Sequence, residues 1–139
     1  MTTATAEQAS KELFLRYVDA AVSGKFDAFD EIFAPEYVTF PDLPPGPEGT
    51  KMLIGHLHRV FERFHVQVER IVAEGDWIAV HIVLCGVQRE DFLGHPASGG
   101  ALAMHEMQFL RVEGGRFVER RVVFDTLEGL RQLGANPTW

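Results

Sequence analysis

The sequence is poor in cysteine and in positive charge, and it has no long apolar run. Its one cysteine, Cys85, excludes an internal disulfide and gives no cysteine-based metal site. Lys and Arg number 13 against 20 Asp and Glu, a formal net charge of −7, which argues against nucleic-acid and anionic-membrane partners. No apolar stretch approaches the roughly 18 residues of a membrane span, and polar residues 1–11 lack the apolar region of a signal peptide. We therefore expect a cytoplasmic protein.

Apolar residues are nevertheless abundant, since 46% of the chain is hydrophobic and 11 residues are Phe. A chain of 139 residues has the usual size of one domain, so we expect a single domain over residues 1–139. The histidines are scattered, and His56 and His58 would lie on different sides of a helix. We expect no metal and no cofactor.

The first half of the chain predicts helices. Leu13, Tyr17 and Ala21 recur at helical spacing, and Ser23-Gly24 ends that pattern. A short second helix ends before Pro35, residues 37–40 suggest a short strand, and residues 41–47 hold four prolines and form a loop. The third helix carries one apolar stripe. Its members are Leu53, Leu57, Val60, Phe61 and Phe64.

After Phe64 the apolar period changes from about 3.6 to 2, which predicts strands. Four are expected, over residues 65–72, 77–88, 101–112 and 116–124, with a turn at 74–76 after the first and a helix over 126–133 after the last. Strand 77–88 is apolar on both faces and is therefore expected to be central. Helices followed by an antiparallel meander predict an α+β fold with the helices on one face of the sheet.

Three local strings, in this order along the chain, resemble the SnoaL-like polyketide cyclase family of the NTF2-like superfamily. The first is PPGPEG at 44–49, before the third helix. The second is AEGDWIAV at 73–80 with FLGHPASG at 92–99. The third is GRFVE at 115–119, then Asp125, then GLRQLG at 129–134. The resemblance implies a cone, also described as cystatin-like, in which a curved sheet and packed helices surround a pocket.

The resemblance also implies a homo-oligomer without cofactor and with a hydrophobic small-molecule substrate. In the family's cyclases an acidic residue ending the last strand catalyses an intramolecular aldol ring closure on an aromatic polyketide ester. Asp125 stands at that position. The chain departs from the family at three others. Phe40 and Gln108 replace histidines that many members carry, and Arg121 replaces a tryptophan. Phe40 and Phe61 are candidate substrate-binding residues.

Asp125 is the first catalytic candidate on its own sequence context. It follows Val122-Val123-Phe124, and apolar neighbours disfavour a charged carboxylate, which raises its pKa toward neutrality. A base positioned in this way contributes about 10²–10⁴ to a rate. The alternative is that Asp125 caps the helix that follows, since Asp is a favoured N-cap. Both roles can hold together.

The partner strand supplies further candidates. A two-residue turn at Gly114-Gly115 places Arg121 opposite Gln108, and Glu106 diagonal to Asp125. Glu106 would then act with Asp125, Gln108 would donate a hydrogen bond to an enolate oxygen, and Arg121 would bind substrate. If a bulge adds one residue to the turn, the inner face instead holds His105, Met107 and Phe109, and His105 becomes the donor.

Other functions remain open on the sequence. The chain could be a binding protein in which Asp125 only caps a helix, or another proton-transfer or hydration enzyme, such as an isomerase or a hydroxylase-associated protein. Tyr17, Asp42 and Asp125 would suit a steroid-isomerase-like use of the fold. The sheet is apolar on both faces and the helices are too few to cover both, so we expect a homodimer or homotetramer.

Overall fold

The structure, a computed structural model, describes residues 3–136 and has the expected α+β architecture. Helices come first and an antiparallel sheet follows, which confirms the predicted order. The elements are α1 Thr3–Ser23, η1 Phe26–Ala28, α2 Phe29–Ile32, α3 Pro47–Val60, β1 Phe61–Glu74, β2 Trp77–Gln88, β3 Ala101–Glu113, β4 Arg116–Phe124 and α4 Thr126–Gln132.

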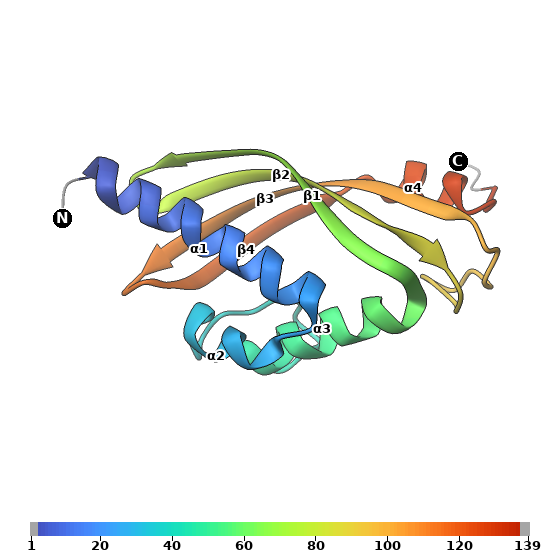
Figure 1. The fold of residues 1–139 in the computed structure, drawn as a ribbon, viewed down its shortest axis with the longest axis horizontal. Helices are drawn as coiled ribbons and strands as arrows, with labels where there is room; N and C mark the ends of the chain where they lie inside the picture. Colours follow the sequence, from blue (N-terminus) through green and yellow to red (C-terminus); the bar gives the residue numbers. More distant parts are fainter. Residues whose placement is uncertain (1–2, 137–139) are drawn as a thin grey trace.

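The four strands form one curved antiparallel sheet in the order β1-β2-β3-β4, so each strand pairs with its neighbour in sequence. Figure 1 shows α1 lying across the strands, with α2 and α3 on the same side of the sheet. Helix α1 contacts β1 and β2, whereas the short helix α4 packs on β3. The side of the sheet that faces α1 is called the inner face below, and the opposite side is called the outer face. Among residues 3–136, no helix is both long and apolar enough to cross a membrane.

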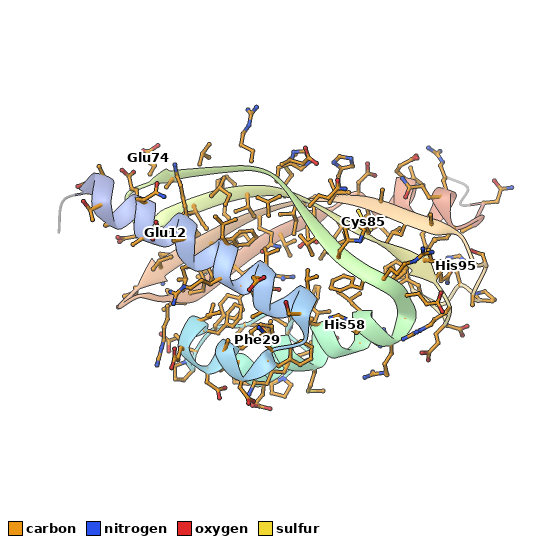
Figure 2. The ribbon with its side chains drawn as sticks, viewed as in Figure 1. Glu12, Phe29, His58, Glu74, Cys85 and His95 are labelled. Carbon is orange, nitrogen blue, oxygen red and sulfur yellow. The ribbon has the colours of Figure 1, made fainter. Side chains whose placement is uncertain are left out.

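Aromatic side chains fill the layer between the helices and the sheet. Phe14, Phe29, Phe33 and Phe117 are at most 1% exposed. They come from α1, α2, the loop after α2 and β4, and their rings meet edge to face or tilted, a favourable arrangement for aromatic pairs. Figure 2 labels Phe29 among the helices, beside α2. This packing joins the helical first half of the chain to the sheet.

The third helix is shorter than its apolar stripe predicted. It ends at Val60, and Phe61 and Phe64 belong to β1. Residues three apart normally lie on opposite faces of a strand, but an irregularity between Glu62 and His65 turns both phenylalanines inward, with Arg63 at φ 54°. Gly86 on β2 makes room for the inward-pointing Phe61, because a Cβ at position 86 would lie 2.7 Å from the Cβ of Phe61.

The strand predicted over residues 37–40 is absent, and this prediction was wrong. Residues 37–40 lie between two turns; Tyr37 N–H donates to the carbonyl of Ala34, and the Tyr37 carbonyl accepts from Gly46 N–H. Pro35 and Pro41 flank it and offer no N–H to a neighbouring strand. The nearby contact with the sheet is a single bridge between Phe33 and Phe117.

Candidate active site

A cavity of about 290 Å³ lies between the inner face of the sheet and helices α1 and α3. Its lining is mainly apolar, drawn from both layers of the fold, as is usual for small-molecule sites. The apolar lining includes Leu53, Leu57, Phe61, Phe64, Phe92, Leu102, Met104 and Phe124, together with Phe40. The polar lining includes Tyr17, His56, Glu106, Gln108, Arg120 and Thr126. Phe40 and Phe61, expected from the sequence to contact substrate, both line this cavity.

Strand β3 places two polar side chains in the cavity. Glu106 and Gln108 are two residues apart and therefore point to the same, inner face, where they are 4% and 5% exposed. Gln108 Nε2 donates a hydrogen bond of 2.5 Å to Glu106 Oε1. Burial raises the pKa of the Glu106 carboxyl from 4.5 to about 7, although Arg120 and the Gln108 hydrogen bond act in the opposite direction. Glu106 can therefore hold or release a proton at neutral pH.

The arginine in the cavity is Arg120, and the prediction that Arg121 shares a face with Gln108 was wrong. The two-residue turn at Gly114-Gly115 is present, since Glu113 pairs with Arg116. Beyond it the register shifts between Arg111 and Val112, because Val118 is an extra residue on β4. Arg121 consequently pairs with Phe109 on the outer face, where its side chain is 76% exposed and bridges to Glu119 at 3.3 Å.

Aromatic side chains hold the Arg120 guanidinium in place. Its Cζ lies 4.9 Å from the centroid of the Phe40 ring, a cation–π contact, and Phe40 stacks on Phe124. The Tyr37 hydroxyl is a hydrogen-bond neighbour of the same guanidinium. Burial raises the pKa of Tyr37 to about 12 and that of Tyr17 further, even though Arg120 lowers both. Both phenols are therefore neutral donors at physiological pH.

Asp125 lies at the end of β4, where its side chain is exposed. Its carboxylate accepts a hydrogen bond of 3.3 Å from Glu128 N–H, so it is the N-cap of α4, as the alternative interpretation expected. Its neighbours Phe124 and Thr126 line the cavity, whereas Asp125 is not among the lining residues. Proton transfer by Asp125 stays a prediction.

His105 points to the outer face, so the alternative in which His105, Met107 and Phe109 line the inner face was wrong. Its Nδ1 lies 2.7 Å from Nε2 of His81, with which it shares a hydrogen bond. Met107 and Phe109 are more than half exposed on the same face. The bulge occurs inside β4 rather than at the turn, so it moves the residues of β4 and leaves those of β3 in place.

Sequence reasoning missed Arg120 and treated Tyr17 chiefly as a core residue of the helix. The signal for Arg120 is weak, because adjacent arginines give no preference for either one. Arg120 comes three residues after Phe117, which is fully buried. Arg120 points inward with Phe117 only if a bulge adds a residue between them, whereas in an ordinary strand Arg121 would point inward, and the sequence is compatible with either. Helical periodicity does place Tyr17 on the buried face, but it cannot show that this face lines a cavity.

Together these features define the class of protein: a small α+β domain with an apolar cavity that holds a buried carboxyl, an amide and a guanidinium. The family model described as SnoaL-like polyketide cyclase matches residues 11–133, so the chain belongs to this family. No curated protein sequence matches it significantly.

Solved structures agree with this assignment. TsrD from Streptomyces laurentii is similar at a TM-score of 0.87 and 27% identity, covering 93% of this chain and 97% of TsrD. IdmH from Streptomyces antibioticus, considered a polyketide cyclase, has a TM-score of 0.76 and 27% identity over 90% of this chain and 98% of its own. A SnoaL-like candidate cyclase from Jannaschia sp. CCS1 has a TM-score of 0.79 and 27% identity over 94% and 95%.

Proposed function

We propose that this protein is an acid/base enzyme that closes a ring on a polyketide-like substrate in the apolar cavity, with Glu106 as the proton-transfer residue. The observation that supports this most is the buried Glu106 carboxyl, hydrogen-bonded to Gln108 and with a pKa of about 7. A general base is most effective when its pKa lies near the working pH. The family assignment supports the substrate class.

The proposed reaction consists of proton transfers and one carbon–carbon bond. The Glu106 carboxylate removes a proton from a carbon between two carbonyl groups, and the electron pair moves onto a carbonyl oxygen as an enolate. Gln108 uses one amide hydrogen on Glu106 and has a second for that oxygen. The enolate carbon attacks a second carbonyl of the same molecule, and Glu106 returns the proton to the alkoxide. No electron is gained or lost, so the reaction requires no redox cofactor.

The first step can be tested without the natural substrate. The probe is ethyl benzoylacetate, an aryl β-keto ester, whose acidic carbon exchanges hydrogen for deuterium in D₂O, measured by proton NMR against a protein-free control. We expect the wild type to accelerate exchange and Glu106→Gln to lower that acceleration by at least about 10². Glutamine is nearly isosteric and its carbonyl can still accept the Gln108 hydrogen bond, so the fold should persist.

Asp125→Asn is the matched control, because Asn caps a helix about as well as Asp. We expect it to retain the exchange rate. Loss of exchange in Asp125→Asn with full exchange in Glu106→Gln would return the catalytic role to Asp125, as the sequence first suggested. Exchange at the protein-free rate in the wild type would count against the acid/base proposal and favour a binding protein.

A further inference from the structure

Arg120 carries two buried hydrogen-bond donors without a partner. Its Nε and Nη2 atoms have no solvent exposure and no acceptor among residues 3–136. Buried polar groups are nearly always hydrogen-bonded, and an unsatisfied charged donor is strongly destabilising. The residue lines the cavity, so a molecule bound there can supply the missing acceptors once the side chains that cover Nε and Nη2 move aside.

The groups around Arg120 leave this edge unused. Glu106 is close enough to interact electrostatically, but its oxygen accepts from Gln108, and the described residues include no ion pair between Glu106 and Arg120. The Phe40 ring lies against the guanidinium, with Cζ 4.9 Å from its centroid, and offers no hydrogen-bond acceptor. An aromatic ring therefore contacts the guanidinium while Nε and Nη2 remain without an acceptor.

The two free donors have a defined geometry. Nε and Nη2 lie on the same edge of the guanidinium, and their N–H bonds point in parallel. Such a fork matches two coplanar oxygens about as far apart as the donors, and it binds them through two hydrogen bonds. A single carbonyl or hydroxyl oxygen would have to be shared by the two donors, and both hydrogen bonds would then be bent.

We propose that Arg120 is the specificity-determining anchor of the cavity and binds the two coplanar oxygens of a carboxylate or a 1,3-dicarbonyl enolate carried by an otherwise apolar molecule. The inference rests on the proposal that this cavity is the substrate site. The mainly apolar lining suits the rest of such a molecule, and a volume of about 290 Å³ sets its size near the lower end of small-molecule sites. Protonation of Glu106, whose pKa is about 7, favours an anion in the cavity, so binding should weaken as pH rises through neutrality.

Binding, rather than turnover, tests the anchor. The probes are 2-naphthoate, its neutral isostere 2-naphthamide, and a naphthyl 1,3-diketone, each titrated into the protein by calorimetry. We expect naphthoate or the diketone to bind the wild type at least tenfold more tightly than the amide. If naphthoate binds more tightly than the diketone, the two oxygens belong to a carboxylate; if the diketone binds more tightly, they belong to a 1,3-dicarbonyl enolate.

Three variants locate the interaction. Arg120→Lys keeps the charge and loses the fork, so the advantage over the amide should fall about tenfold. Arg120→Gln should remove the advantage of the acidic probes over the amide. If Arg120→Gln does not fold, the result for Arg120→Lys decides. Arg121→Gln changes the neighbouring arginine on the outer face and should leave all affinities unchanged.

Equal binding of the amide and both acidic probes by the wild type would overturn the proposal. So would a full advantage retained in Arg120→Lys, a loss in Arg121→Gln as large as in Arg120→Lys, or no binding of any probe at millimolar concentration. Glu106→Gln separates this inference from the proposed function, because it should abolish proton exchange and still bind the acidic probe. Failure of exchange in the wild type with Arg120-dependent binding intact would reject the chemistry and keep the anchor.

Discussion

Residues 106–109 of β3 reverse the usual distribution of side chains between the two faces of the sheet. Glu106 and Gln108 point inward and are about 5% exposed, whereas Met107 and Phe109 point outward and are 55% and 58% exposed. Burying a carboxyl in an apolar layer is unfavourable unless the group is hydrogen-bonded or paired, and a patch of large apolar side chains in solvent marks an interaction surface. The inner face therefore buries a carboxyl at a cost in stability, and the outer face exposes large apolar side chains.

The pH dependence of the free energy of unfolding should reveal the cost of burying the Glu106 carboxylate on the inner face. The pKa of Glu106 is about 7 in the folded protein and 4.5 as its ordinary value, so the native state binds more protons between these pH values. The free energy of unfolding should therefore fall as pH rises from about 4.5 to 7, by at most about 3 kcal/mol from this group, and level off above. Urea unfolding of Glu106→Gln should lack this fall.

The quantity to compare is the difference in unfolding free energy between the wild type and Glu106→Gln, at pH 5 and at pH 8. Other groups titrate equally in both proteins and cancel. Glu36→Gln, which changes an exposed carboxyl, is the control and should show no such difference. A wild type and Glu106→Gln with parallel profiles would mean that the Glu106 carboxyl behaves as an exposed one.

For the outer face we expect the opposite of the inner face: its exposed apolar side chains should become buried against another protein surface. We propose that a second copy of the chain covers it. Val72, Met107, Phe109 and Val123 are all more than half exposed there. Four strands about 4.8 Å apart and roughly ten residues long present roughly 600 Å², near the ~800 Å² per partner of a standard interface.

The charges on this face also suit a second copy. Arg111, Glu113, Glu119 and Arg121 form a network of ion pairs at 3.0 to 3.3 Å beside the apolar residues. A face that carries both signs can meet itself across a two-fold axis, because acidic groups of one copy can face basic groups of the other. This supports the expectation of a homodimer or homotetramer.

Sedimentation of the wild type and Phe109→Asp tests this proposal. We expect the wild type to exceed the 15.6 kDa monomer mass at micromolar concentration. Phe109→Asp loses about 2 kcal/mol of apolar burial at the interface, so association should weaken by about 30-fold or more. Met52→Asp places the same charge at an exposed apolar position on α3 and should not change the mass. A monomeric wild type would reject this use of the outer face.

The comparison of the faces also shows how far the sequence could predict the structure. Strong periodicity predicted α1 and the four strands, and the Gly114-Gly115 turn placed Glu106 and Gln108 on one inner face. The choice between Arg120 and Arg121 failed because Val118 is an extra residue. The bulge allows Phe117 to pack against Phe14 and Phe33, partners that lie far away in sequence. Gly86 was a partial signal for the other bulge, because only a residue without a Cβ fits against Phe61.

The smallest expected effect lies at the sheet end, where Asp125 links β4 to α4. Its side chain accepts from Glu128 N–H, and its carbonyl accepts from Gly129 N–H at 3.1 Å. Asp125→Ala removes the side-chain cap and should lower the free energy of unfolding by about 1 kcal/mol, whereas Asp125→Asn should change it by a few tenths. Thermal unfolding should then differ by about 3 °C between the two variants. Equal loss in both would show that the charge near the helix N-terminus stabilises α4, rather than the shape of the cap. No loss in either would show that α4 is held by its packing on β3 and by the Gln132 side chain, whose amide pairs with the Ala103 backbone at 2.7 and 3.1 Å.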